Sequence, residues 1–194
     1  YCISRSVHSE MIDYTSVNDP LCFISGNFYS GKTFFLLEIA RLHFDKKVYI
    51  FPSGTKISDV QLETILKKEN TLSCFDTKSL TTSQIKVISQ SKNLRQVKSK
   101  GSCIVVAIDK SDAPMYKYIF ESRNSDRDFR QLPVKGFFSV GELNAFNNAI
   151  GGISLPPMKQ NQTILDYIVQ NEGKLLGSVP TAEHFLEPHA DLLS

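Results

Sequence analysis

LCFISGNFYSGKTFFLLEIA, residues 21–40, is the stretch that decides the fold of this chain. An apolar run from Leu21 to Ile24 leads into residues 26–33, which match the pattern GxxxxGK followed by Ser or Thr, and a second apolar run follows at once. The two glycines of the pattern let the backbone curl until its N–H groups point at phosphate oxygens, and the N-terminus of the next helix adds partial positive charge. This pattern, between a strand and a helix, predicts a phosphate-binding loop.

The loop assigns chemical roles to individual side chains. Lys32 is expected to reach the terminal phosphates of a nucleotide, and the hydroxyl of Thr33 is expected to bind Mg²⁺. The aromatic pair Phe28 and Tyr29 suits either a cover over the nucleotide or packing against a neighbouring lid. We expect the nucleotide to be bound by Gly26, Asn27, Phe28, Tyr29, Ser30, Gly31, Lys32, Thr33 and Phe34.

The composition is that of an ordinary globular chain. The 194 residues are 41% hydrophobic and 22% charged, which suits one domain or one domain with a small appendage. The net charge of +2 gives no electrostatic reason to expect nucleic acid or an acidic membrane surface as a partner. No signal peptide and no apolar run near the ~20 residues of a membrane span is visible, so we expect a cytoplasmic protein without a membrane partner. The start at Tyr1, not Met, favours a module of a longer protein.

The cysteines do not form a recognisable metal site. They include no CxxC pair and have no accompanying histidine cluster. Three of the four lie in apolar runs that resemble strands, so we expect buried, reduced thiols. The four are Cys2, Cys22, Cys74 and Cys103.

Strand-like and helix-like segments alternate along the chain. Apolar, β-branched runs predict five strands, at 21–25, 47–51, 71–76, 103–108 and 134–138. Capping boxes, apolar periodicity and a Pro near a helix start predict the helices, at 7–13, 32–44, from Ser58, from Thr81, from Asp112, from Ser139 and at 163–172. The basic segment 91–101 lacks interleaved aromatics, which favours a solvated helix end and loop over a binding patch, and residues 175–194 are expected to be irregular.

Alternation of this kind requires a parallel sheet with helices on both faces. We therefore predict a three-layer α/β fold with a five-stranded parallel sheet in residues 1–138, and a small helical lid and linker region in residues 139–194. The phosphate site would lie at the carboxyl ends of the strands.

A phosphate-binding loop also needs a carboxylate at a strand end to hold Mg²⁺. Asp109 follows the more hydrophobic run, IVVAI, and Asp76 follows LSCF, so both are candidates.

The chain resembles the nucleotide-binding module of the STAND class (signal-transduction ATPases with numerous domains), a branch of AAA+-like P-loop NTPases. Besides the loop, four segments carry the resemblance: YCISR, FDTKSL, CIVVAIDKSD and FFSVGELNAFNNAIGG. The resemblance implies that the third strand ends in the metal carboxylate and that the fourth strand lies between it and the strand before the loop. It thereby assigns Asp76 to the metal and Asp109 to a sensor-like position beside the γ-phosphate, with Lys32, Asp76 and Asp109 as the catalytic group.

The same resemblance implies a nucleotide-dependent switch that uses ATP and Mg²⁺, that self-associates or contacts further domains of a longer chain, and that serves signalling or antiviral defence. Many hydrolytic relatives carry an acidic residue after the metal carboxylate, whereas this chain has Thr77 and then Lys78, so we expect slow or conditional hydrolysis. A transition-state arginine would have to come from Arg5, Arg123, Arg127 or Arg130.

Three other functions remain open. Residues Asp109–Asp112 (DKSD) resemble the NKxD motif of GTPases, although the first position should be Asn, which both donates and accepts hydrogen bonds. Another AAA+ or RecA-like ATPase that acts on nucleic acid is the second alternative, which the low net charge disfavours. The third is a scaffold module in which bound ATP has a structural role.

Overall fold

The computed structural model describes residues 19–28, 30–43, 45–124, 129–152 and 155–178. The chain divides into two compact units, with the boundary between Gly136 and Phe137. The helix predicted at 7–13 lies outside the described residues.

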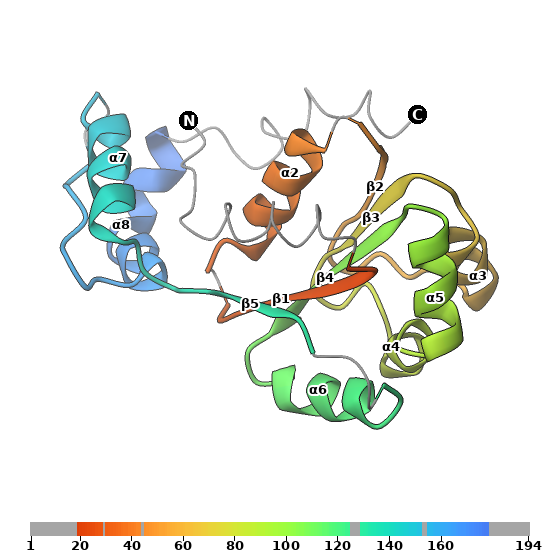
Figure 1. Cartoon of the computed structure of the whole chain (residues 1–194). Helices are drawn as coiled ribbons and strands as arrows, with labels where there is room; N and C mark the ends of the chain where they lie inside the picture. The colour runs from red at the N-terminus through yellow and green to blue at the C-terminus, as the bar shows by residue number, and fades with distance from the viewer. Residues whose placement is uncertain (1–18, 29, 44, 125–128, 153–154, 179–194) are drawn as a thin grey trace. The chain divides into compact units, whose positions relative to one another are not determined.

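Strands and helices alternate along the larger unit, as the sequence pattern predicts, except that two helices stand between the third and fourth strands (Figure 1). Its strands are β1 (Leu21–Gly26), β2 (Lys47–Phe51), β3 (Thr71–Phe75), β4 (Cys103–Asp109) and β5 (Gln131–Val134). Its helices are α2 (Lys32–Leu42), α3 (Asp59–Leu66), α4 (Thr82–Ile88), α5 (Ser91–Ser99) and α6 (Ala113–Glu121).

The five strands form one parallel sheet with the order β2-β3-β4-β1-β5. The central strand β4 pairs with β1 on one side, where Ile24 lies opposite Ala107, and with β3 on the other, where Cys74 lies opposite Val105. Because both faces of β4 are covered, its side chains from Cys103 to Ile108 are all buried. This sheet confirms the predicted three-layer α/β fold, including the predicted place of the fourth strand.

The two faces of the sheet are covered differently (Figure 1). Among the described residues, α2 covers one face, and it packs Phe35, Leu36 and Ile39 against side chains of β1, β3 and β4. Helices α3, α4, α5 and α6 cover the other face and form the larger core cluster with Phe23, Phe75 and their neighbours. The sheet is thus held from both sides, and its carboxyl edge carries the loops that follow β1, β3 and β4.

Two elements differ from the prediction. The fifth strand is Gln131–Val134, not 134–138, because its pairing with β1 ends where Val134 lies opposite Gly26, at the start of the loop. Pro133 is tolerated there since β5 is an edge strand. The segment predicted as a helix end and loop at 91–101 is the complete helix α5, which buries Leu94 and Val97 and leaves its basic side chains largely exposed.

The local signals for helix starts are confirmed. Each of the three predicted capping boxes is formed, with reciprocal bonds between the cap side chain and the residue three positions later. The described cysteines are free and buried, as expected, and burial raises the pKa of the Cys103 thiol to about 12. Thiols so strongly protonated are inert as nucleophiles at neutral pH.

The smaller unit is built around two helices, α7 (Val140–Ile150) and α8 (Ile164–Ser178), and α8 extends beyond the predicted end at 172. Ile150, Met158 and Tyr167 form its small buried cluster. The connection between the helices is fixed by Asn147, whose amide donates to the Met158 carbonyl at 3.0 Å and accepts from the Met158 N–H at 2.8 Å. The assignment of residues 139–194 to a lid remains a prediction.

Within the part of the chain that the structure describes, every helix is too short or too polar to traverse a lipid bilayer.

Candidate functional site

The loop between β1 and α2 depends on two glycines with different roles. A Cβ atom on Gly26 would lie 2.3 Å from Ser30 Oγ and 2.8 Å from the carbonyl oxygen of Val134, so no larger residue fits. Gly31, which directly precedes α2, has a φ of 89°, in the left-handed region that glycine adopts readily. The Ser30 hydroxyl is buried and has no hydrogen-bond partner among the described residues. The loop therefore folds back so that Ser30 packs closely against Gly26 at the end of β1.

The N-terminus of α2 presents an anion-binding end at this loop. The first intrahelical bond runs from the Phe35 N–H to the Gly31 carbonyl at 3.0 Å, so the preceding N–H groups have no acceptor within the helix. Gly31 provides no side-chain cap, and the first turn carries no acidic residue. Free N–H groups and the positive end of the helix dipole favour a bound phosphate at this position.

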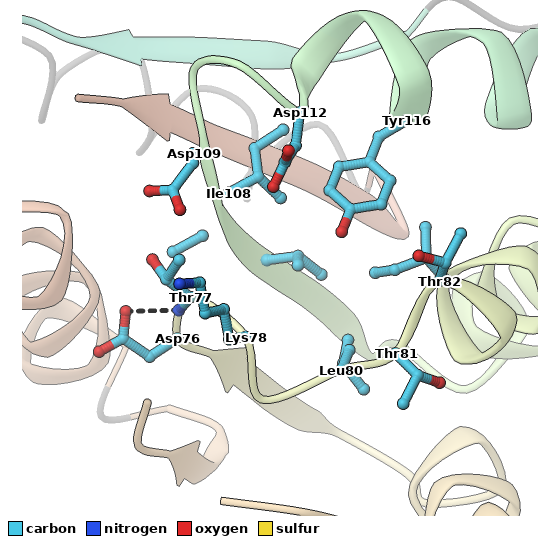
Figure 2. Close-up of a pocket in the computed structure, with 13 residues that line it drawn as sticks. Asp76, Thr77, Lys78, Leu80, Thr81, Thr82, Ile108, Asp109, Asp112 and Tyr116 are labelled. Atoms are coloured by element: carbon cyan, nitrogen blue, oxygen red, sulfur yellow. Dashed lines mark hydrogen bonds between the residues drawn. The ribbon is translucent and has the colours of Figure 1, made fainter. Parts of the chain in front are cut away.

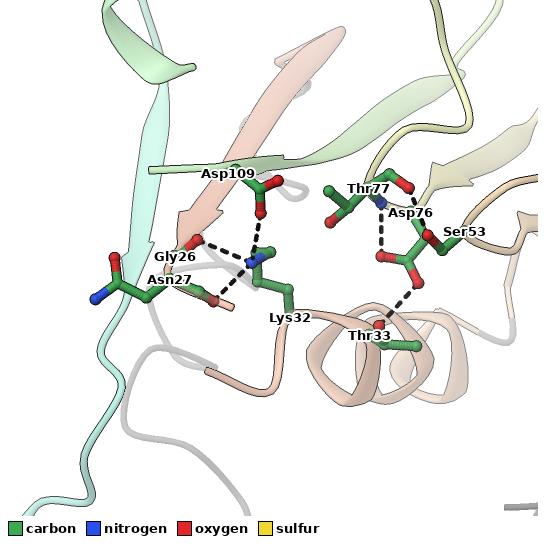
Figure 3. Close-up of polar contacts among 8 residues, drawn as sticks. All are labelled: Gly26, Asn27, Lys32, Thr33, Ser53, Asp76, Thr77 and Asp109. Carbon is green, nitrogen blue, oxygen red and sulfur yellow. Dashed lines mark hydrogen bonds and ion pairs between the residues drawn. The ribbon is translucent and has the colours of Figure 1, made fainter. Parts of the chain in front are cut away.

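Lys32 is held by three oxygen atoms (Figure 3). Its ammonium donates to the carbonyls of Gly26 and Asn27, both at 2.8 Å, and lies 3.3 Å from Asp109 Oδ1. Only 7% of its side chain is exposed. Buried ammonium groups need such partners, because desolvation without them is costly. The three contacts hold the charge at the mouth of the loop, where terminal phosphates would lie.

Asp76 faces the other polar side chain of the loop, Thr33 (Figure 3). The Thr33 hydroxyl donates to Asp76 Oδ2 at 2.8 Å, and the Thr77 N–H donates to Oδ1 at 2.7 Å. Asp76 is only 4% exposed, yet no basic side chain of the described residues lies within ion-pair distance of it. A buried carboxylate without a cation is electrostatically suited to bind one.

Two serines that are absent from the predicted site residues shape the turn after Asp76. Ser79 donates to the Asp76 carbonyl from its hydroxyl at 2.6 Å and from its N–H at 3.1 Å. The Ser53 hydroxyl, from the turn after β2, donates to the Thr77 carbonyl at 2.7 Å. These bonds fix the turn that aims the Asp76 carboxylate at Thr33. Serine is common in turns, so its presence there gives no distinctive sequence signal.

The donor set fits Mg²⁺ better than a metal that needs a dedicated protein cage. Mg²⁺ is usually bound through one or two carboxylates together with substrate phosphates and waters, and it prefers oxygen ligands. Thr33 and Asp76 supply a hydroxyl and a carboxylate side by side. The described residues contain no cluster of three or more His, Cys, Asp and Glu side chains arranged for a metal. The site therefore has the chemistry for a cation that shares its ligands with a phosphate.

A cavity of about 340 Å³ adjoins the two aspartates (Figure 2). Its apolar lining includes Ile85, Val106 and Ile108, and the other lining residues come mainly from the loop after β3 and from helices α4 and α6. Asp109 and Tyr116 both line it. Burial and then the Asp112 carboxylate raise the pKa of the Tyr116 hydroxyl. None of the described phosphate-loop residues lines the cavity, which adjoins the loop through Asp76 and Asp109, the two carboxylates that contact Thr33 and Lys32.

The structure brings Lys32, Thr33, Asp76 and Asp109 together, but it does not bring the described candidate arginines to them. Arg123 bonds to the Ile119 carbonyl and the Ser122 hydroxyl at the end of α6. Arg130 pairs with Asp19 at 3.3 Å and precedes β5, whose first residue lies opposite Phe23, well before the end of β1.

The remaining predicted contacts divide into two groups. Phe28 and Phe34 are 70% and 62% exposed, so both present aromatic surface near the loop. Tyr29, Arg5 and Arg127 lie outside the described residues. The roles predicted for all of these side chains stay predictions.

No protein-family profile matches the sequence, and no curated protein matches it either. Among solved structures, one of DNA unwinding at forked double-stranded DNA by two coordinating Pif1 helicases is similar, with 15% identity and a TM-score of 0.42 over 75% of this chain and 51% of that chain. Bacteroides Pif1 bound to single-stranded DNA gives 18% identity and a TM-score of 0.39 over 76% and 46% of the two chains. The chain spans about half the length of these helicases, and the likeness concerns the fold alone. It does not identify the STAND class.

Proposed function

We propose that this chain is a nucleotide-binding module that binds ATP with Mg²⁺, hydrolyses it slowly and acts as a molecular switch. The observation that carries the proposal is the hydrogen bond from the Thr33 hydroxyl to Asp76, a buried carboxylate that forms no ion pair with any described residue, next to a glycine-bounded loop that holds Lys32. Such a site has the elements that bind a phosphate chain and its metal together. When bound, Mg²⁺ would neutralise charge on the phosphates.

Each residue has a distinct part in this proposal. Lys32 would exchange its contacts with loop carbonyls and Asp109 for the terminal phosphate oxygens. Thr33 and Asp76 would hold Mg²⁺, with Asp76 acting through water. Asp109, which lies 3.3 Å from the Lys32 ammonium, would then face the terminal phosphate as a sensor of its presence.

Slow hydrolysis follows from what stands beside Asp76. A fast ATPase places a carboxylate there to accept a proton from the attacking water. Thr77 occupies that position and uses its N–H to bond to Asp76, and a hydroxyl is a poor proton acceptor at neutral pH. Slow hydrolysis suits a switch, in which ATP and ADP favour different conformations. The protein then keeps ATP bound for longer than its conformational change takes.

A role in signalling or antiviral defence, and self-association or contact with further domains, belong to this proposal through the STAND resemblance alone. So does the assignment of residues 139–194 to a helical lid over the nucleotide. Nucleic acid as a partner is the alternative that the same fold allows, and added single-stranded DNA that accelerates ATP hydrolysis would favour it.

The contact between Asp109 and Lys32 argues against the GTPase alternative. In a guanine-recognition motif the first residue must lie at the base. Asp109 instead contacts the lysine that reaches for the terminal phosphates, 3.3 Å away. A terminal phosphate bound by Lys32 would therefore lie beside DKSD, away from the base.

A thermal-shift comparison of ATP, ADP and GTP, each with and without Mg²⁺, tests the proposed function. Ligand at a hundred times its Kd stabilises a protein by about 2.7 kcal/mol, so ATP with Mg²⁺ should raise Tm by roughly 5–10 °C. GTP should raise it less. Stabilisation by GTP alone would favour the GTPase reading, and no shift with any nucleotide would contradict the proposal.

The metal assignment predicts different behaviour for two matched variants, Asp76→Asn and Asp109→Asn. Asparagine keeps the shape but lacks the charge that attracts a cation. Asp76→Asn should lose most of the gain in ATP affinity that Mg²⁺ provides, by about tenfold or more, because one charge-assisted contact is lost. Asp109→Asn should keep this gain. Titration of ATP at fixed Mg²⁺ concentrations measures it, and the reverse pattern would move the metal to Asp109.

A further inference from the structure

Lys78 has a backbone conformation that its side chain does not favour. Among the described residues, six have positive φ in the left-handed region, and five of them are glycine or asparagine. These two types tolerate that conformation, because glycine lacks a Cβ and the asparagine side chain can bond locally. Lys78, with a φ of 65°, is the exception. Such outliers cluster at functional sites, where the surrounding structure holds them in place.

The surrounding structure does hold Lys78 in place. Its neighbours on both sides are fixed, since the Thr77 carbonyl accepts from Ser53 and Ser79 donates twice to the Asp76 carbonyl. Ser79 and Asp76 are both buried, whereas Lys78 itself is exposed. The turn thus presents one exposed side chain, two residues after the proposed metal carboxylate.

The Lys78 side chain lines the cavity that also reaches Asp76 and Asp109 (Figure 2). No ion pair or side-chain hydrogen bond joins Lys78 to any described residue. Lys32, the other lysine of the site, is by contrast tied to three oxygens. Lys78 is therefore an uncommitted cation on a rigid turn, beside the place where phosphate charge would develop.

We propose that Lys78 binds the terminal phosphate of the nucleotide and so distinguishes ATP from ADP. The inference rests on the proposed function and adds a specificity-determining residue to it. When Lys32 leaves Asp109 for the phosphates, the site gains the charge of the nucleotide and loses an internal ion pair. The Lys78 ammonium, on its long side chain, offsets the negative charge of the terminal phosphate. Without it, an arginine from another segment would be needed for this purpose. Since ADP lacks the terminal phosphate, ADP gains nothing from Lys78.

The test compares Lys78→Gly, Lys78→Asn and Lys78→Arg by calorimetry with ADP and with a non-hydrolysable ATP analogue, both with Mg²⁺. Lys78→Gly and Lys78→Asn should lower affinity for the ATP analogue about tenfold or more, as expected for a lost bond to a charged group, and leave ADP affinity unchanged. Lys78→Arg should retain most of the preference for ATP. Because glycine and asparagine suit the left-handed backbone, Tm of these two variants should not fall, which separates loss of binding from loss of folding.

Lys86→Ala, at an exposed position on α4, removes the same charge away from the turn and should leave both affinities unchanged. Equal losses for ATP and ADP in Lys78→Gly, an unchanged ATP preference, or a similar effect of Lys86→Ala would each overturn the inference.

Nucleotide binding by the wild-type protein distinguishes failure of this inference from failure of the proposed function. If the wild-type protein binds neither nucleotide, the proposed function fails and this inference fails with it; if it binds both and only the Lys78 effect is missing, this inference alone fails.

Discussion

Lys32→Ala should lower the affinity for ATP by about 100-fold. A hydrogen bond to a charged group is worth about 1.5–3 kcal/mol, and 1.4 kcal/mol corresponds to a factor of ten, so loss of one strong or two modest phosphate contacts gives this magnitude. The position also makes the effect specific. Two carbonyls and Asp109 already hold the ammonium at the mouth of the loop, so the side chain needs little reorganisation to reach a phosphate. Calorimetric titration of ATP with Mg²⁺ into both proteins measures the change.

A folding control belongs with this variant, because Lys32 also serves the nucleotide-free protein. Its removal leaves the carbonyls of Gly26 and Asn27 without their donor and Asp109 without its cation. We expect Lys32→Ala to remain folded, since Asp109 is partly exposed and the loop carbonyls can accept water. Lys86→Ala is the matched charge control and should bind ATP as the wild type does. Unchanged ATP affinity in a folded Lys32→Ala protein would refute the phosphate-loop assignment.

Gly26→Ala should abolish nucleotide binding and destabilise the larger unit. The new Cβ would approach Ser30 Oγ to 2.3 Å and the Val134 carbonyl to 2.8 Å, both closer than real Cβ contacts. The first contact distorts the phosphate loop, and the second pushes on the last residue of β5, which pairs with Gly26 itself. Overpacking of this kind typically costs about 1–3 kcal/mol, or roughly 2–10 °C in Tm. Thermal unfolding and ATP titration measure the two effects.

Two further variants serve as controls for Gly26→Ala. Gly136→Ala is a matched control, because a Cβ there meets no atom within 4 Å and its φ does not lie in the left-handed region. It should leave Tm and ATP binding unchanged. The double variant Gly26→Ala with Ser30→Ala removes the closest clashing atom, so it should recover part of the lost stability. A Gly26→Ala protein that binds ATP normally would show that the loop can open without cost.

Much of the fold follows from local signals in the sequence. The order of the sheet is not one of these signals, because the STAND resemblance implied it; the continuous apolar run of β4 fits the central place, where both faces of a strand are buried. The three capping boxes fixed helix starts because each uses a bond between residues three positions apart. β5 begins three residues before its predicted start, because its limits are set by pairing with β1, a long-range contact that composition does not encode.

The sequence identifies the side chains that the structure brings together at the loop, but not their contacts. The loop pattern identifies Lys32 and Thr33, and strand ends identify Asp76 and Asp109 as a choice of two. The choice depends on distances that no single segment contains, namely Asp109 next to Lys32 and Asp76 next to Thr33. The left-handed backbone of Lys78 gave no sequence signal, since lysine is not a residue that this conformation selects.

The most direct test of the central claim is a crystal structure of the protein with a non-hydrolysable ATP analogue and Mn²⁺ in place of Mg²⁺, in which anomalous scattering locates the metal. We expect the terminal phosphates to lie at residues 26–33, within hydrogen-bond distance of Lys32. We also expect a single metal peak between these phosphates and the Thr33 hydroxyl, with Asp76 reached directly or through one water. A metal peak on Asp109, or a nucleotide bound away from the loop, would contradict the central claim.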